Sequence, residues 1–381
     1  MTNWRIALLY NLKRPSILGA DDAPDMLADL ADPETVQNIE RALLATGHEV
    51  IPLEADATLL DSIRQTNPDI CFNIARGLNG KNRLSQIPAL LEMLSIPFTG
   101  SDAQAHLVAR DKSTARHLWQ TKSLPVADGQ IFQQATDVLA IEPLRFPLIV
   151  KPVREGSGTG LNAESIVHNE AEMRMRIEWV INTYQQPALV ERYLPGREFS
   201  VGIFGNATMS GHQQWSDLYG ADGFHIFPLL EVNTTKGSAN GVYGADARLL
   251  RPDMPDAPNY LCPAALSSEL ETELQQLALN AFKAVGASDV ARVDLRLDEE
   301  GKPHLIEIDT LPNLDPYIGD LFLTAKVEGI SYDNLINEIL QLAMARNGLM
   351  DWQLRPTRAL YESKSLGEQN RILDLAECGQ E

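Results

Sequence analysis

The stretch ARVDLRLDEEGKPHLIEIDTLP, residues 291–312, places acidic side chains at alternating positions on both sides of a glycine-containing turn. Two such runs separated by a short polar segment predict a β-hairpin that turns at residues 298–302. Glu307 and Asp309 are two residues apart, so their side chains share one face of the second strand. Asp294 on the first strand can lie opposite them. The stretch therefore predicts three carboxylates on one face of a sheet.

Three carboxylates on one face repel each other unless a cation lies between them. Carboxylate oxygens on a rigid sheet suit Mg²⁺ that bridges phosphate groups. Arg292 is two residues from Asp294 and faces the same side, where it can steady an anion. The alternative is a solvated face with alternating charge, which is common in hairpins. Because Leu305, Ile306 and Ile308 alternate with the acids, we favour metal binding.

A second stretch, LIVKPVREGSGTGL at residues 148–161, carries Lys151 on a strand and then the glycines and small residues of a loop. Its G-x-G-x-G spacing fits neither the dinucleotide fingerprint nor the Walker phosphate loop. A loop containing Gly156, Ser157 and Gly158 can nevertheless bring backbone N–H groups against a phosphate. A solvent-exposed hairpin turn explains the loop equally well. The stretch alone leaves both interpretations open.

The composition of the whole chain narrows the classes of protein. The 381 residues carry a formal net charge of −20, which disfavours nucleic acids and anionic lipid as partners. Three widely spaced cysteines argue against a disulfide framework and fit a reducing cytoplasm. No run reaches the roughly 18 apolar residues of a membrane span. We expect a cytoplasmic protein that binds small molecules and neither nucleic acid nor membrane.

The order of strand and helix patterns predicts three structural units and a tail. Residues 1–111 alternate strands with helices and predict an open parallel sheet, an α/β domain. Residues 112–205 and 206–347 are rich in strands with short connections and predict α+β units. An irregular stretch at 233–263 is long enough to be a functional lid. Residues 348–381 form a polar tail.

Taken together, these segments resemble the ATP-grasp superfamily and, within it, the D-alanine–D-alanine ligases. The resemblance covers residues 70–346 and implies an ATP-grasp fold behind an N-terminal pre-ATP-grasp domain. The matching segments, in order, are SIPFTGSDA, RDKSTARHLWQTKSLPVA, FPLIVKPVREGSGTGL, LVERYLPGREFSVGIFG, NYLCPAAL and ARVDLRLDEEGKPHLIEIDTLP.

The resemblance implies a nucleotide site. Lys112 and Lys151 would contact the phosphates of ATP, and Glu191 and Glu198 would hold adenine and ribose. The loop at 156–160, with its Gly156, Ser157 and Gly158, would close over the phosphates. Two Mg²⁺ ions, which Mn²⁺ can replace, would bind the three hairpin carboxylates.

The resemblance also implies the chemistry. A carboxylate would attack ATP to give an acyl phosphate and ADP, and an amine would then displace phosphate. Arg292 would stabilise the oxyanion of the second step. Ser157 and Lys236 are carried over as catalytic residues, and a homodimer is expected.

The amino-acid half departs from the family's pattern. The G-G-x-S-x-E segment after the first strand is absent, so the Glu that holds an ammonium group is missing. Arg76-Gly77 replaces His-Gly, and Lys236-Gly237 replaces the lid's Lys-Tyr. DTLPN replaces NTLPG, with Asp309 for Asn, and Ile318 falls near the position expected to supply a hydroxyl.

These departures predict a ligase with a changed substrate pocket, of the kind used in specialised metabolism. Arg76, with Lys13 and Arg14 after the first strand, would suit an anionic group and repel an ammonium; the alternative is that the two loop cations point to solvent. The acyl donor should then lack a free α-amine or carry extra negative charge. The competing hypotheses are a divergent D-alanine–D-alanine ligase and a nucleotide-binding protein without catalysis.

Overall fold

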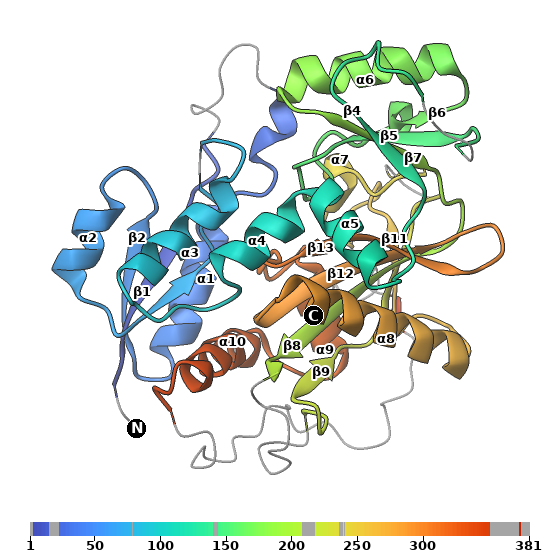
Figure 1. Cartoon of the computed structure of the whole chain (residues 1–381). Helices are drawn as coiled ribbons and strands as arrows, with labels where there is room; N and C mark the ends of the chain where they lie inside the picture. The colour runs from blue at the N-terminus through green and yellow to red at the C-terminus, as the bar shows by residue number, and fades with distance from the viewer. Residues whose placement is uncertain are drawn as a thin grey trace.

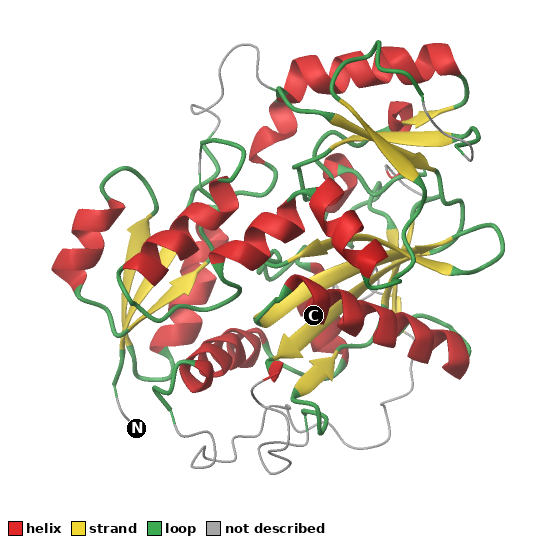
Figure 2. Ribbon diagram, in the orientation of Figure 1, coloured by secondary structure: helices red, strands yellow, loops and turns green. Residues whose placement is uncertain are grey.

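The computed structural model describes residues 3–14, 23–77, 79–139, 144–207, 218–235, 239, 241–350 and the short strand at 373–374. Three sheets, each with its own helices, surround a central region (Figures 1 and 2). Lys236 and most of the predicted tail lie outside the described residues. Within the described part of the chain, no helix combines the length and the apolar character that a bilayer span requires.

The N-terminal sheet confirms the predicted parallel arrangement. Its central strand β1 (Arg5–Tyr10) is flanked by β2 (Glu49–Glu54) and β3 (Ile70–Asn73), both parallel to it. Its helices are α1 (Pro33–Leu44), α2 (Leu59–Thr66) and α3 (Arg83–Met93), and the 3₁₀ turn η2 (Pro24–Leu27) precedes α1.

Helix α1 buries Val36, Ile39 and Leu43 as its spacing predicts. Asp32 occupies the N-cap position, but its side chain makes no capping hydrogen bond, so Asp32 does not cap the helix as its residue type suggests.

The middle unit is an antiparallel sheet of four strands. Their order is β4 (Gly129–Phe132), β7 (Ala188–Arg192), β5 (Leu148–Pro152) and β6 (Ile166–Val167), with the turn η3 (Ala163–Ser165) just before β6. Helix α6 (Glu170–Tyr184) lies along this sheet and buries Met173, Ile177 and Val180 against it (Figure 1). The unit therefore has its own core, to which Ala23 and Met26 of the N-terminal segment also contribute.

The largest sheet holds the predicted hairpin. It runs β13 (Pro303–Asp309), β12 (Asp289–Leu297), β8 (Glu198–Gly205), β10 (Leu230–Asn233), β11 (Asn259–Cys262) and β14 (Leu373–Asp374), with β9 (Phe224–Ile226) paired to β8. Strand β8 lies within the range 112–205 that we expected to form the middle unit, yet it pairs with β12 and β10. Its fully buried side chains, such as Phe199 and Val201, fill the core of the large sheet.

Helices α4 (Ala103–Arg110), α5 (Lys112–Thr121) and α8 (Ser268–Val285) cover one side of the large sheet. Asp102, Asp111 and Ser267 cap them, each by accepting a hydrogen bond from a backbone N–H of the first turn. The turn of α4 into α5 at Asp111 matters for the site, because it directs Lys112 toward the hairpin.

The last helices connect two of the units. Helix α10 (Tyr332–Arg346), which follows α9 (Asp320–Val327), packs on α1 and on β12. One continuous apolar core contains Leu8 and Phe72 of the N-terminal sheet together with Leu335 and Ile336 of α10. The N-terminal sheet and the large sheet therefore form one packed body.

Candidate active site

The hairpin has the register that its spacing predicts. Asp294 lies opposite Glu307 and Arg292 lies opposite Asp309 in the antiparallel pair β12–β13. Residues that are directly opposite in such a pair point to the same face. The structure therefore confirms that three carboxylates and one arginine share one face.

Arg292 lies at the centre of this face. Its Nε and Nη2 donate to the two carboxylate oxygens of Asp294 at 2.9 and 3.1 Å. Its guanidinium is also 3.7 Å from Glu307, 3.8 Å from Asp309 and 3.7 Å from Asp320. Burial would lower the pKa of Arg292, but Asp294, Asp320 and Asp309 outweigh it and raise the pKa well above its usual value. The arginine is therefore a permanent cation among acids.

The three hairpin carboxylates differ in what they contact. Both oxygens of Asp294 are engaged, because Ser200 Oγ donates at 2.7 Å and Arg248 Nη2 at 3.0 Å in addition to Arg292. Glu307 and Asp309 keep 14% and 11% of their side chains exposed and line one cavity together. Their hard oxygens suit Mg²⁺.

A complete metal centre is not assembled in this arrangement. Among the described residues, no three acidic, histidine or cysteine side chains converge as ligands of a metal ion do. The donor chemistry of Glu307 and Asp309 fits Mg²⁺, whereas Asp294 is held by its arginines. Metal binding by all three stays a prediction.

Lys112 connects the hairpin to the glycine loop. Its Nζ lies 3.0 Å from Glu307 Oε2 and also donates to the backbone carbonyl of Glu155. Burial alone would raise the pKa of Glu307, but Lys112, Arg248 and Arg292 hold it below its usual range. Glu307 is therefore ionised beside a lysine at the position where the resemblance puts the phosphates.

The glycine loop turns through backbone conformations that glycine adopts readily. Ser157, Gly158 and Gly160 have φ values of 54°, 74° and 78°, in the left-handed region. A side chain at Gly158 would collide with the backbone of Gly244, and Ala245 N donates to Gly158 O at 3.0 Å. The loop therefore packs directly on the segment that we expected to be a lid.

The lid segment contributes two residues that sequence reasoning missed. Tyr243 and Arg248, the latter from α7 (Ala245–Arg248), line one cavity with Ser157 and Arg292. Tyr243 Oη lies 3.2 Å from an oxygen of Asp320, and the Arg248 guanidinium lies 3.9 Å from the Tyr243 ring centroid. A lid tyrosine thus lines the same cavity as Ser157, although the motif position at residue 237 holds glycine.

The two predicted nucleotide-binding glutamates are both buried and paired. Glu191 on β7 contacts Lys151 and Arg116. Burial would raise the pKa of Glu191, but these two cations lower it. Glu198 on β8 pairs with Arg296 at 3.1 Å, and burial raises its pKa. The structure brings Lys151 and Glu191 together; the binding of ATP by these residues stays a prediction.

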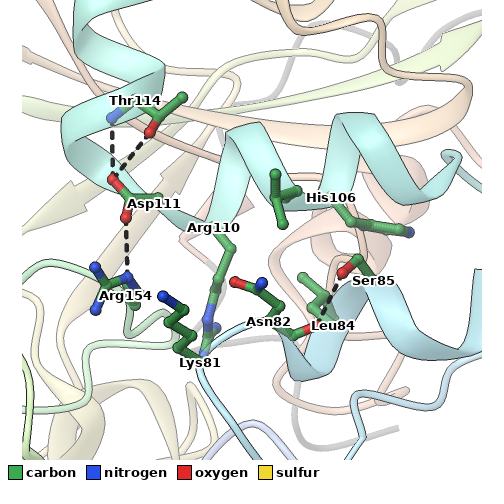
Figure 3. A pocket seen from close by; sticks show the side chains of 10 residues that line it. Lys81, Asn82, Leu84, Ser85, His106, Arg110, Asp111, Thr114 and Arg154 are labelled. Atoms are coloured by element: carbon green, nitrogen blue, oxygen red, sulfur yellow. Dashed lines mark hydrogen bonds and ion pairs between the residues drawn. The ribbon is translucent and has the colours of Figure 1, made fainter. Parts of the chain in front are cut away.

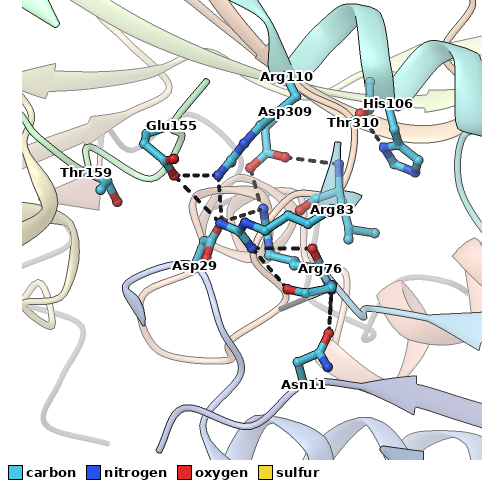
Figure 4. Close-up of polar contacts among 12 residues, drawn as sticks. Asn11, Asp29, Arg76, Arg83, His106, Arg110, Glu155, Thr159, Asp309 and Thr310 are labelled. Carbon is cyan, nitrogen blue, oxygen red and sulfur yellow. Dashed lines mark hydrogen bonds and ion pairs between the residues drawn. The ribbon is translucent and has the colours of Figure 1, made fainter. Parts of the chain in front are cut away.

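Sequence reasoning missed an acid in the segment between β1 and α1, the segment that lacks the G-G-x-S-x-E pattern. Asp29, which follows η2, is surrounded by arginines from three segments (Figure 4). Its Oδ2 lies 2.7 Å from Arg83, 3.2 Å from Arg110 and 3.9 Å from Arg76. Burial would raise the pKa of Asp29, but Arg83, Arg110 and Arg76 hold it far below its usual range. No local motif predicts these contacts, because the partners are distant in sequence.

The same cluster reaches the hairpin. Arg76 lies 3.6 Å from Asp309 and donates to the carbonyl of Leu311, and Asn11 holds the backbone N–H of Arg76 at 2.9 Å (Figure 4). The predicted cation at residue 76 is therefore part of the site. Arg14 is exposed and pairs with Glu54 at 2.6 Å, so for Arg14 the solvent alternative holds.

Comparison with known proteins agrees with this geometry. A family model described as the D-ala D-ala ligase C-terminus matches residues 118–341. The uncharacterized protein y4sG of Sinorhizobium fredii is 32% identical over 324 residues, covering 82% of this chain and 89% of that protein. The D-alanine–D-alanine ligase of Nitrosococcus oceani is 31% identical over 313 residues, covering 82% and 88%.

The fold is shared with a solved structure. The D-alanine–D-alanine ligase from Bacillus anthracis, complexed with ATP, superposes with a TM-score of 0.67 at 18% identity, covering 91% of this chain and 99% of that one. At this identity the likeness shows the fold, and the sequence matches show the family. The chain therefore belongs to the D-alanine–D-alanine ligase family of ATP-grasp enzymes and is an ATP-dependent ligase that forms a carbon–nitrogen bond.

Proposed function

We propose that this enzyme joins an amine to an acid other than D-alanine, through an acyl phosphate and with release of ADP. The acid lacks a free α-amine or carries an additional negative charge. The observation that carries this proposal is the charge environment of Asp29. Its carboxylate is surrounded by three arginines. We further propose a cytoplasmic homodimer of three units, in which the middle unit carries the glycine loop.

The described residues support distinct roles in this reaction. Lys112, Lys151 and the loop at 156–160 would bind the phosphates of ATP, and Glu191 and Glu198 would bind adenine and ribose. Glu307 and Asp309, with Asp294, would hold Mg²⁺, or Mn²⁺ in its place, which when bound neutralises charge on the phosphates.

The chemistry then has two balanced steps. A carboxylate oxygen of the acid bonds to the γ-phosphorus while the bond to ADP breaks. The amine nitrogen next bonds to the acyl carbon, loses a proton, and phosphate leaves. Arg292 supplies fixed positive charge beside the oxyanion. Ser157 and Lys236 would assist as catalytic residues, and the lid segment with Tyr243 and Arg248 would exclude water from the acyl phosphate.

The first test is the nucleotide product. With ATP, Mg²⁺, a panel of acids and hydroxylamine as a general amine, we expect ADP and phosphate together with a hydroxamate, because an acyl phosphate transfers its acyl group to hydroxylamine. Chromatography of the nucleotides and the colour reaction of hydroxamates with iron(III) provide the measurements. AMP and pyrophosphate as stoichiometric products would contradict the proposal.

The second test is the acid. The charges of Arg76, Arg83 and Arg110 are matched by those of Asp29, Glu155 and Asp309, so this cluster has no excess negative charge with which to hold an ammonium group. We therefore expect D-alanine, as the sole amino acid at millimolar concentration, the usual upper range of KM, to be a poor substrate. The measurement is D-alanyl-D-alanine by mass spectrometry and ADP by a coupled assay. Efficient dipeptide formation would show that the pocket accepts an ammonium group.

One observation favours the competing hypothesis of a divergent D-alanine–D-alanine ligase. Asp29 Oδ1 is buried and accepts no hydrogen bond from any described residue. This oxygen could accept from a substrate ammonium. Under that hypothesis Asp29→Asn raises the KM for D-alanine at least tenfold, whereas Asp32→Asn, at an exposed N-cap without a capping bond, does not. Under our proposal D-alanine is a poor substrate of the wild type and of both variants.

A further inference from the structure

A cavity of about 180 Å³ lies beside the reaction centre, between the first turns of α3 and α5. Lys81 precedes α3, Arg110 ends α4 and Arg154 follows β5, and the side chains of these three cations are directed toward one another (Figure 3). Asn82 and Ser85 add polar groups to the wall. The cavity is thus basic in a chain whose net charge is −20.

The cations of this wall outnumber its acids. Asp111 supplies the acid in the lining, and its carboxylate accepts from Arg154 Nε at 2.9 Å. Arg110 pairs with Glu155 at 2.7 Å. Lys81 is exposed and makes no hydrogen bond or ion pair with another described residue. A ligand anion can therefore take Lys81 as a partner without displacing an acid of the protein.

The cavity adjoins the predicted position of acyl transfer. A second cavity is lined by Lys112, Glu307 and Asp309 near the glycine loop, and Leu84 and Arg110 line both cavities. An acid whose reacting carboxylate lies near Lys112 can therefore extend past Arg110. Its far end would then lie among Lys81, Arg110 and Arg154.

We propose that this basic cavity is the subsite for a second anionic group of the acyl donor. The inference rests on the proposed ligase function and makes its substrate class more specific: the donor is a dianionic acid, with a carboxylate that reacts and a second carboxylate or phosphate that is bound. Charge-assisted hydrogen bonds hold that second group. Lys81 and Arg154 determine specificity and do not contact the reacting atoms.

Binding of short dicarboxylates tests this proposal without turnover. Succinate, glutarate and adipate are titrated by calorimetry into the full chain with ADP and Mg²⁺, each against the monocarboxylate of equal length. We expect one dicarboxylate to bind at least about tenfold more tightly than its monocarboxylate, since hydrogen bonds to charged groups are strong. Lys81→Ala should abolish this preference and Lys81→Arg should retain it. Lys122→Ala, at the opposite end of α5, is the matched control.

The outcomes separate this inference from the function on which it rests. Equal binding of dicarboxylates and monocarboxylates, or a preference that survives in Lys81→Ala, overturns the subsite. A preference that Lys81→Ala removes supports it, and 3-phosphonopropionate in place of succinate, which has the same number of methylenes, then distinguishes a phosphate-type from a carboxylate-type group. The hydroxamate assay tests the ligase function separately, because monocarboxylates that yield hydroxamate would uphold the function even when the subsite fails.

Discussion

Replacing Glu307 with glutamine is expected to remove nearly all turnover while leaving the fold intact. Glu307 lies opposite Asp294, 3.0 Å from Lys112 and 3.7 Å from Arg292, in the cavity where the phosphates are predicted to bind. Glutamine keeps the size and shape of the side chain but removes the negative charge that a Mg²⁺ ligand supplies. A metal ion contributes several kcal/mol to such a transition state, so we expect kcat to fall at least about a thousandfold.

The rate of ADP release at saturating ATP and increasing Mg²⁺ measures this effect, and thermal unfolding followed by circular dichroism checks the fold. Glu300→Gln is the matched control, because Glu300 is exposed in the turn of the same hairpin and pairs with Lys302. A near-normal rate in Glu307→Gln would show that the acidic face of the hairpin is a set of structural ion pairs and not a metal site.

Replacing Arg292 with lysine is expected to slow acyl transfer about a hundredfold to a thousandfold, the usual effect of removing one oxyanion donor. Lysine keeps the charge but loses the planar fork with which Arg292 contacts Asp294 at 2.9 and 3.1 Å. The remaining guanidinium nitrogen, Nη1, lies close to Asp309 and Asp320 at the edge of the cavity that also contains Ser157.

Rapid-quench experiments resolve the two steps. We expect Arg292→Lys to retain a burst of ADP, from acyl phosphate formation, and to form hydroxamate slowly. Arg192→Lys, near the end of β7 and paired with Glu299, should behave as the wild type. Equal slowing of both steps would show that Arg292 acts on the carboxylates of the hairpin and not on the oxyanion.

The hairpin could be predicted from sequence because its geometry is local. A two-residue spacing fixes which side chains share a face, and the turn fixes the register, so Asp294 lies opposite Glu307 as expected. Helix α10 (Tyr332–Arg346), which begins at its N-cap Ser331, is a local element of the same kind. Such elements depend on periodicity, which a single sequence displays.

The other half of the site could not be predicted, because it is assembled from distant loops. Asp29 contacts Arg83 and Arg110, which follow it by 54 and 81 residues in the sequence, and no motif links them. Tyr243 reaches the cavity of Ser157 from a lid whose path depends on the packing of Gly158 against Gly244. A buried charge cluster of this kind is visible only once the backbone has brought its members together.

The core that joins the N-terminal sheet to α10 also fixes one side of the cluster around Asp29 and Arg76, where the acid is proposed to bind. The segment that carries Arg76 packs on the body that also carries the hairpin, whereas the segment around η2, just before Asp29, contributes Ala23 and Met26 to the core of the four-stranded sheet. Arg76 is thus held by the core of the hairpin body, and Asp29 lies where that body meets the four-stranded sheet. The conformational entropy of these side chains is lost when the chain folds. Binding of the acid therefore carries little further entropy cost. A substitution on the inner face of α10, such as Leu335→Ala, would loosen the packing of this core. It would thereby weaken acid binding from a position that no substrate touches.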